Sequence, residues 1–381
     1  MKDRSDPPQP GSQREDKRAT PWQRNNMNAV RIIAALQVAV HHSLAHFRLG
    51  IDGRFVYILS LFPGVPIFFF ASGMLISRSL HRSGDLRNYA RNRALRLYPG
   101  LWAAFVVGIT LAVLGGYRPE TSLAQFVAWT FGQLSVVQFY NPHFMRAYGT
   151  GVLNGSLWTI VVELQFYALL PVLLITLRAI KRGSTLRNTV LGVLAALFAL
   201  ANVVFMHAGG QTSDAAVLKF VDVSFVPWVY MFIVGVIVEE NFDVVFAFVQ
   251  RFVLPLTLAA ALLLCASRPV LGFDVDNRLN PAVFAMLATL IFVASFALRP
   301  VFSDAQKRWD ISYGLYLYHM PVVNLLLYRK WPSRLSSVAV VLSCTVVLAS
   351  LSWRFVESKA LQRKARHRRA RDPLTANVRP Q

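Results

Sequence analysis

The sequence predicts an all-α polytopic membrane protein, a bundle of about ten transmembrane helices with both termini in the cytoplasm. Of its 381 residues, 55% are hydrophobic and only 15% are charged, and the mean hydropathy is +0.43. Soluble domains usually have about a quarter of their residues charged, so a soluble globule is excluded. Apolar runs of about 17–22 residues recur along the chain, and each is long enough to cross a hydrocarbon core of ~30 Å as a helix.

The two ends of the chain differ in composition from its middle. Residues 1–26 are rich in Pro, Gln, Asp, Arg and Lys and have almost no apolar periodicity, which is typical of a disordered tail. They contain no signal-peptide pattern. Residues 358–381 form a basic tail that we expect on the anionic inner surface of the membrane. Residues 27–357 are predicted to be one membrane domain.

Ten apolar runs are interpreted as spans. They are residues 27–47, 60–78, 99–116, 157–177, 188–207, 223–239, 252–267, 282–298, 311–328 and 336–355. The stretch Leu123–Tyr140 is left out because glutamines interrupt its aromatic residues. It is predicted to be an interfacial or re-entrant helix.

The distribution of basic residues sets the predicted orientation. With both termini inside, 29 of the 40 Lys and Arg lie on the cytoplasmic side and 10 outside, while Arg31 lies in the first span. An eleven-span model that counted Leu123–Tyr140 would place the basic loop 178–187 outside, so it is rejected. Topology and anionic lipid therefore account for the net charge of +21 without nucleic acid.

Neither a disulfide nor a metal site is predicted. Cys265 and Cys344 both lie inside apolar runs, where they are interpreted as small core residues. No metal-ligand spacing occurs in the sequence. Ionisable residues inside spans are costly, so the few that occur are the functional candidates.

The first span contains an arginine and a histidine on one face. Arg31 and His42 are eleven residues apart, and eleven steps of about 100° bring them to the same side, about 16 Å apart along the axis. His42 is then about 7 Å below the outer boundary. The alternative for Arg31 is a snorkelling anchor, and the alternative for His42 is an interface histidine.

The fourth span contains a carboxylate, Glu163, about two turns below the outer surface. Tyr167 follows one turn later and can donate a hydrogen bond to it, and Trp158 can anchor the interface. His42 and Glu163 lie at similar depth, so we hypothesise that Glu163 orients His42 as a general base. The alternative is that Glu163 pairs with some other cation.

Two further candidates lie on the cytoplasmic side and in the ninth span. Arg93 and Arg96 share one side of a helix, which Pro99 is predicted to end. Paired guanidiniums suit a phosphate-bearing ligand, although ordinary positive-inside charge also explains them. His319 is followed by Pro321, and it is either a packed core histidine or part of an acyl-donor path.

Six short motifs follow one another along the chain. They are R-x10-H (Arg31, His42), F-F-x-x-S-G-x-L-I (Phe68 to Ile76), R-x-x-R-x-x-P (Arg93, Arg96, Pro99), S-L-W-T-x-x-x-E-x-x-F-Y (Ser156 to Tyr167), I-S-Y-x-L-Y-L-x-H-x-P (Ile311 to Pro321) and S-W-R-F-V-E (Ser352 to Glu357). This series resembles the acyltransferase 3 family of integral-membrane O-acyltransferases. The resemblance extends over about residues 27–357.

The resemblance implies a reaction, its substrates and a location. An acyl group, commonly acetyl, would pass from cytoplasmic acyl-CoA to a hydroxyl of a glycan, a lipid-linked sugar or another small acceptor, at the bacterial cytoplasmic membrane. Acyl-CoA would be a co-substrate, with no bound cofactor and no metal. Any periplasmic partner that completes the transfer would be a separate protein.

The resemblance also implies roles for the candidate residues. His42 would be the base, Arg31 and the Arg93/Arg96 pair would bind the donor, and Glu163 would belong to the active site. Trp158, Tyr167 and His319 are further candidates for substrate contact. The alternative function is a transporter or flippase, which would be expected to show internal symmetry between its halves. We find none in the sequence.

Overall fold

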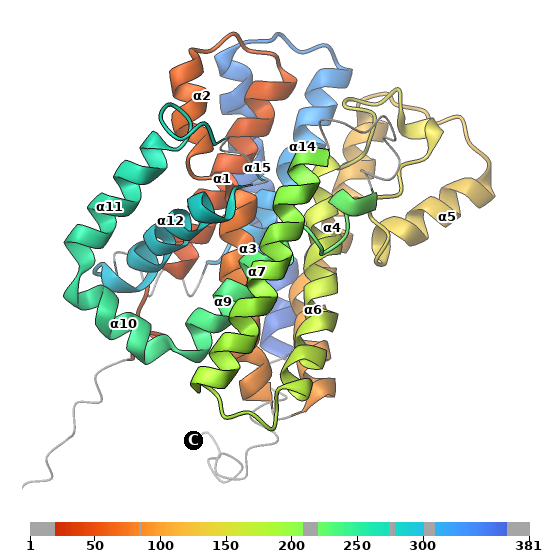
Figure 1. Ribbon diagram of the computed structural model, residues 1–381. Coiled ribbons are helices and arrows are strands. Elements are labelled where there is room, and N and C mark those ends of the chain that lie inside the picture. Colours follow the sequence, from red (N-terminus) through yellow and green to blue (C-terminus); the bar gives the residue numbers. More distant parts are fainter. Residues whose placement is uncertain are drawn as a thin grey trace, which may run out of the picture.

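The computed structural model describes residues 20–83, 85–208, 220–273, 277, 279–300 and 309–363. This described part is all-α, with thirteen α-helices and no strand, which confirms the predicted fold class (Figure 1). The helices are α1 (Met27–His46), α2 (Gly53–Ser60), α3 (Gly64–Ser83), α4 (Leu86–Leu114), α5 (Leu123–Leu134), α6 (Trp158–Thr176), α7 (Thr185–Ala208), α9 (Val229–Glu240), α10 (Phe242–Arg251), α11 (Val253–Ala266), α12 (Pro281–Phe292), α14 (Ser312–Tyr328) and α15 (Leu335–Ser352).

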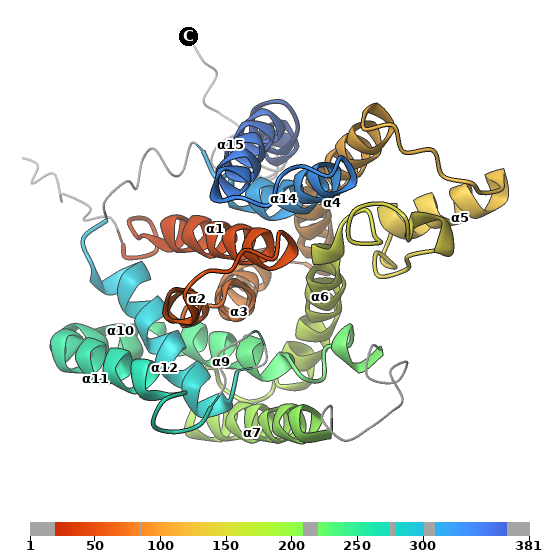
Figure 2. The ribbon, with the colours of Figure 1, turned by 90° about the horizontal axis from the view of Figure 1, so that it is seen from above.

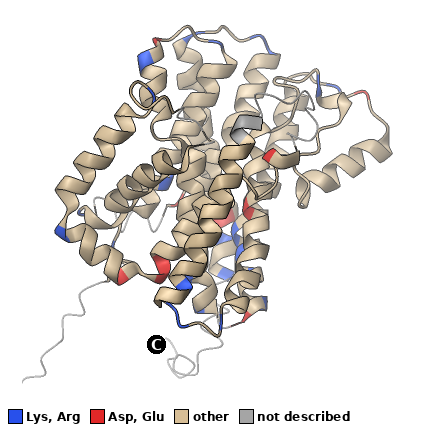
Figure 3. Cartoon of the chain, in the orientation of Figure 1, with Lys and Arg blue, Asp and Glu red and all other residues tan. Residues whose placement is uncertain are grey.

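The helices support an integral membrane protein, with fewer clear spans than predicted. Five helical segments of the described chain are long and apolar enough to cross a membrane: 53–83, 86–114, 155–176, 185–205 and 335–363. The pair α10 and α11, bent by 89°, makes a sixth if it forms one span. Lys, Arg, Asp and Glu are few along the helices (Figure 3). The count of ten spans and the cytoplasmic placement of both termini stay predictions.

Helix α14 lies inside the bundle, packed against α1, α4 and α15 (Figure 2). Most of its 17 residues are buried, including His319 and Asn324. At ~1.5 Å per residue such a helix is about 25 Å long. Protein surrounds it, so it tolerates the histidine, asparagine and tyrosines that lower its hydropathy. Its position brings the ISY…H motif to the centre of the molecule.

Helices α3 and α9 approach each other closely through two glycines. A Cβ built on Gly73 would overlap the carbonyl oxygen of Phe232 and lie 3.0 Å from Cα of Gly235. A Cβ on Gly235 would in turn overlap the carbonyl oxygen of Phe70. Small residues that let helix backbones touch are the usual means of helix association in membranes. Gly73 of the FFxxSGxLI motif therefore fixes the position of α3 against α9.

We expect Gly235→Ala to lower the melting temperature of the purified protein in detergent, because its methyl group forces α3 and α9 apart. Overpacking of this kind costs about 1–3 kcal/mol. Gly192→Ala in α7 is the matched control, because a Cβ there meets nothing within 4 Å. Gly192→Ala should leave the melting temperature unchanged or raise it, since alanine favours helix more than glycine does. Equal melting temperatures for the two variants would contradict the assigned contact.

The prediction that Pro99 ends a helix is wrong. Pro99 lies inside α4, which runs without interruption through the arginine cluster into the apolar segment. Proline removes one backbone hydrogen bond but does not prevent a helix where tertiary packing holds it. Here α4 packs along α14, and the Tyr313 hydroxyl donates to the carbonyl of Leu97, 3.1 Å away. Arg93 and Arg96 are thus rigidly connected to a membrane helix.

The segment set apart as interfacial or re-entrant contains α5, which lies to one side of the bundle (Figures 1 and 2). Its 12 residues give about 18 Å of helix, too short to cross ~30 Å of hydrocarbon. Leu123, Val127 and Phe131 are exposed along one face, while Trp129 is fully buried on the other. An apolar face that is exposed on a helix too short to span fits the predicted interfacial position.

Part of the predicted N-terminal tail is packed against the bundle. The Trp22 ring lies 4.5 Å from that of Phe242, and the Arg78 guanidinium lies 4.0 Å from the Trp22 ring. The backbone N–H of Asn26 donates to the Ser295 carbonyl at 2.8 Å. Residues 1–19 of this tail and 364–381 of the C-terminal tail lie outside the described residues.

A buried ion pair joins α7 to α9 near the loop 178–187. The Arg187 guanidinium donates two hydrogen bonds of 2.7 Å to the two carboxylate oxygens of Glu240. It also donates to the carbonyls of Leu177 and Ile180. A bidentate pair with further hydrogen bonds to backbone carbonyls is the favourable form of a buried ion pair. Arg187 therefore has a structural role as well as contributing to topology.

Candidate active site

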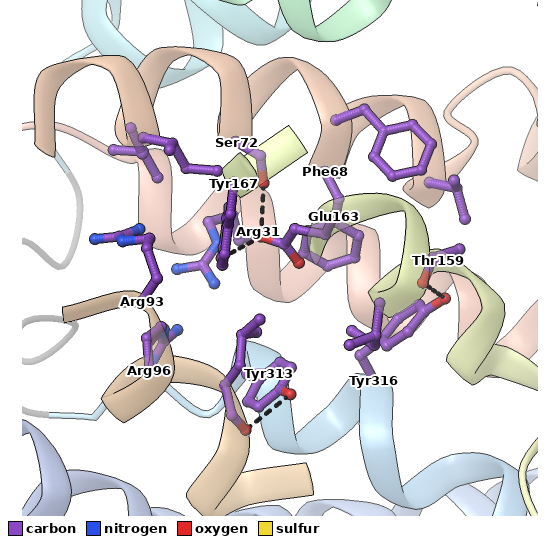
Figure 4. Close-up of a pocket in the computed structure, with 16 residues that line it drawn as sticks. Arg31, Phe68, Ser72, Arg93, Arg96, Thr159, Glu163, Tyr167, Tyr313 and Tyr316 are labelled. Atoms are coloured by element: carbon purple, nitrogen blue, oxygen red, sulfur yellow. Dashed lines mark hydrogen bonds between the residues drawn. The ribbon is translucent and has the colours of Figure 1, made fainter. Parts of the chain in front are cut away.

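Five helices, α1, α3, α4, α6 and α14, surround a pocket with a cationic end and an aromatic end. Figure 4 shows Arg93 and Arg96 at one end, Thr159 and Tyr316 at the other, and Glu163 between them. The residues that line the pocket are Arg31, Val65, Phe68, Phe69, Ser72, Leu75, Ile76, Arg93, Arg96, Leu97, Thr159, Ile160, Glu163, Tyr167, Tyr313 and Tyr316. Five of the six motifs therefore contribute to one cavity.

Arg31 and Arg96 meet at the cationic end through a carboxylate that the sequence analysis had not singled out. One oxygen of Asp310, Oδ2, accepts from Arg31 Nη1 at 3.0 Å and from Arg96 Nη2 at 2.7 Å. The Ser312 hydroxyl donates to the other oxygen at 2.6 Å. Burial alone would raise the pKa of the Asp310 carboxyl, but the two guanidiniums hold it well below its usual range. Asp310 is therefore ionised at neutral pH.

A second carboxylate, that of Glu357, lies near Arg96. Glu357 lies in a π-helical turn after α15, and its Oε2 is 3.9 Å from Arg96 Nη1. Its Oε1 accepts a hydrogen bond of 3.0 Å from the Ser352 hydroxyl. The final motif, SWRFVE, thus supports the arginine of the third motif. At 3.9 Å this contact is weaker than that with Asp310.

Arg93 differs from the other two arginines because no described carboxylate pairs with it. Its Nη2 donates to the Ser79 hydroxyl at 2.9 Å, and its guanidinium lies 5.6 Å from the centre of the Tyr167 ring. Its Nε is buried and has no hydrogen-bond partner among the described residues. A buried cationic donor left in this state favours an anionic ligand in the pocket.

Glu163 occupies the middle of the pocket and accepts two hydrogen bonds. The Tyr167 hydroxyl donates to its Oε1 at 2.7 Å, as predicted from their spacing of one turn. The Ser72 hydroxyl donates to the same oxygen at 3.1 Å. Tyr89 holds the next turn of α6 in place, since its hydroxyl donates to the Tyr167 carbonyl. Glu163 is thus fixed by residues of three helices.

The His42 side chain pairs with His319, which is a correction to the expected pairing with Glu163. His42 Nδ1 is 2.9 Å from His319 Nε2, and the two rings are 5.1 Å apart. The hydrogen bonds of Glu163 in the described chain come from Ser72 and Tyr167 instead. Similar depth in the membrane did not imply lateral contact, because α1 packs against α14 here.

The histidine pair adjoins the aromatic end of the pocket. The Tyr316 ring, which lines the pocket, is 5.9 Å from the His319 ring and 5.6 Å from the Phe68 ring. Its hydroxyl is fixed by Thr159 Oγ1 at 2.6 Å and by the Ser156 carbonyl at 3.0 Å. Neither His42 nor His319 lines the pocket itself. One tyrosine ring therefore lies between the pocket and the pair.

Trp158 does not line the pocket. It is partly buried, and its ring packs 5.1 Å from that of Trp228. The pocket residues that went unnoticed in the sequence, Thr159, Tyr313 and Tyr316, lie in motifs that had been recognised. Asp310 had a usable signal, because it directly precedes the ISY motif and the intramembrane Arg31 needs a counter-charge.

Comparison with known proteins gives a consistent result. The model of a family described as an acyltransferase domain matches residues 24–354. Nodulation protein 10 of Rhizobium leguminosarum bv. viciae is 32% identical over 356 residues, which cover 89% of this chain and 94% of that protein. The O-acetyl transferase of Shigella phage Sf6 is 25% identical, over 90% and 97% of the two chains.

A third relative is longer than this chain. The peptidoglycan O-acetyltransferase OatA of Listeria monocytogenes is 26% identical over 90% of this chain, and the match covers 57% of that protein. No solved structure matches the chain. Two of these relatives are named as transferases, which decides between the enzyme and the transporter considered above. The chain belongs to the acyltransferase 3 family of membrane acyltransferases.

Proposed function

We propose that this protein transfers an acetyl group from acetyl-CoA to a hydroxyl of a glycan. The observation that carries the proposal is the pocket, which has an incompletely paired arginine at one end and adjoins a histidine pair at the other. An acyl-CoA has the matching polarity, with phosphates at one end and a small apolar acyl group at the other. The names of two relatives support acetyl as the group transferred.

The cationic end would hold the phosphates of the donor. Arg93 has a buried Nε–H without a described partner, and Arg31 and Arg96 each have further N–H groups beyond those given to carboxylates. Guanidiniums bind phosphate through planar, charge-assisted hydrogen bonds. The distribution of basic residues predicts that residues 78–98 lie on the cytoplasmic side, where acetyl-CoA is found. The pantetheine arm would then extend past Glu163 toward the aromatic end.

The histidine pair would supply the general base. With Nδ1 of His42 directed at Nε2 of His319, the other ring nitrogen of His42 is the one left for a substrate. In the proposed step His42 Nε2 takes the proton from the acceptor hydroxyl, and the hydroxyl oxygen attacks the thioester carbonyl. The C–O bond forms, the C–S bond breaks, and the proton passes to the departing thiolate of CoA. Atoms and charge balance without a further reactant.

The acceptor is proposed to be a saccharide. The Listeria relative is named for peptidoglycan, a glycan, which supports this class. The exposed Tyr140 and His143 beside α5 offer ring surfaces that a sugar can stack on. Trp129 and Tyr148 are fully buried within an aromatic cluster and cannot serve in this way without a rearrangement.

The test is acetyl transfer by the purified protein in lipid, with radiolabelled acetyl-CoA and a crude glycolipid and peptidoglycan extract as acceptors. Labelled glycan that releases acetate in mild base is the expected product, because O-esters are cleaved under these conditions. Transfer from another acyl-CoA but not from acetyl-CoA would correct the donor. Absence of both transfer and acyl-CoA binding would overturn the proposal.

A further inference from the structure

Asp310 is the residue of the cationic end that the proposed chemistry leaves without a role. It precedes α14 and connects that helix to two others, α1 through Arg31 and α4 through Arg96. Both bonds end on the same carboxylate oxygen, Oδ2, while the Ser312 hydroxyl fixes Oδ1. The Asp310 side chain is 13% exposed and each arginine side chain 16% exposed, so solvent screens these contacts little.

The position of Asp310 relative to the pocket indicates how it acts. Arg31 and Arg96 line the pocket, whereas Asp310 does not. The carboxylate therefore holds the two guanidiniums from outside the cavity. Each guanidinium has five N–H groups, and Asp310 accepts from one nitrogen of each. Further N–H groups therefore remain on each guanidinium, so the bonds to Asp310 do not use all the donors that a ligand could accept from.

The charge of Asp310 makes the close approach of two cations possible. Two guanidiniums that share one acceptor atom repel each other strongly at low dielectric, and each would turn away if the carboxylate were neutral. Glu357 is the next nearest carboxylate, at 3.9 Å from Arg96. No described contact links Glu357 to Arg31. Among the described residues, Asp310 is therefore the carboxylate that forms an ion pair with both arginines.

We infer that Asp310 is a positioning residue for the acyl donor, which pre-organises Arg31 and Arg96 as one phosphate-binding unit. The inference rests on the proposed function, because it takes the phosphates of acyl-CoA as the ligand of these arginines. Pre-organised side chains lose less conformational entropy when a ligand binds, so the effect belongs to donor affinity. The reacting groups at the other end of the pocket should be left unaffected.

The test compares steady-state kinetics of Asp310→Asn with wild type in lipid, with acetyl-CoA as the varied substrate. We expect KM for acetyl-CoA to rise about tenfold or more, the effect of a lost charge-assisted contact, while kcat changes less than about threefold. Ser312→Ala, which frees only Oδ1, should raise KM less. Asp310→Glu retains the charge, so its KM should lie between those of wild type and Asp310→Asn.

The control is Glu240→Gln, which breaks the buried contact between Arg187 and Glu240. Neither Glu240 nor Arg187 lines the pocket, so this variant should lose melting temperature and retain the KM of wild type. If Asp310→Asn does not fold, the inference is tested instead by the KM for acetyl-CoA of Asp310→Glu and Ser312→Ala. Their KM values should exceed that of wild type, and values equal to wild type would refute the inference.

Four other outcomes would contradict the inference. A lower KM in Asp310→Asn would mean that Asp310 competes with the donor, which overturns the positioning role. A fall in kcat at constant KM would also overturn it. If wild type itself uses no acyl-CoA, the proposed function fails and the inference fails with it, whereas normal wild-type turnover with an unchanged KM in Asp310→Asn refutes the inference alone.

Discussion

His42→Ala is expected to lower kcat for acetyl transfer by about 10²–10⁴-fold, the usual contribution of a positioned general base. His42 is the residue of the first motif that pairs with a second histidine, and its free ring nitrogen has no competing described bond. The alanine variant should fold and bind acetyl-CoA like wild type, because His42 does not line the pocket. Transfer to glycan and binding of the donor are measured on the same preparation.

The adjacent His41→Ala is the matched control for this experiment. It removes an imidazole from the same helix, next to His42 but outside the 2.9 Å contact with His319. Its kcat should stay within about threefold of wild type. If His42→Ala retained full transfer, or if His41→Ala lost as much, the assignment of the base would be wrong.

His319→Ala should have a smaller effect of the same kind. It removes the ring nitrogen that faces His42 Nδ1, so His42 loses its orientation but keeps its own basic nitrogen. We expect kcat to fall about tenfold, the value of one hydrogen bond that positions a catalytic group. His319→Gln, which retains a polar group at the end of the side chain, should recover part of the activity. A normal kcat in His319→Ala would exclude a role for the pair.

The sequence was sufficient for the fold class and for several of the residues that line the site, since these depend on local patterns. Apolar runs with few charges identify membrane helices, and the spacing of Glu163 and Tyr167 places both on one face of α6. Charged residues inside spans are rare enough that each is a candidate. Arg31, Arg93, Arg96, Glu163 and Tyr167 accordingly lie in one pocket.

The pairing of these residues could not be predicted, because depth in a membrane is only one of three coordinates. His42 and Glu163 were matched by depth, yet the partner of His42 is on α14, 277 positions away in the sequence. Asp310 is 279 positions from Arg31 and 214 from Arg96, so no local pattern relates them. The prediction that Pro99 ends a helix failed for a different reason. It applied a local rule for helix ends, but packing along α14 keeps α4 continuous through the proline.

Arg93→Ala is expected to raise KM for acetyl-CoA about ten- to hundredfold with little change in kcat. Hydrogen bonds to charged groups are worth about 1.5–3 kcal/mol, which corresponds to this range. Arg31 and Arg96 are already paired with Asp310, whereas Arg93 contacts the Ser79 hydroxyl and the Tyr167 ring and pairs with no carboxylate of the described residues. Arg93→Ala therefore removes a cation whose charge is not neutralised by an ion pair with any described carboxylate.

The control for Arg93 is Arg91→Ala, two positions earlier on the same helix. Arg91 is exposed and outside the pocket, so it shares the general positive charge of the region but not the contact with a ligand. If KM rose equally in both variants, the effect would come from long-range attraction of an anionic donor, and 1 M salt would abolish it. Arg93→Lys distinguishes further, because it retains the charge without the planar fork. A KM near that of Arg93→Ala would show that the donor is held by directed hydrogen bonds, whereas a KM near that of wild type would show that charge alone is sufficient.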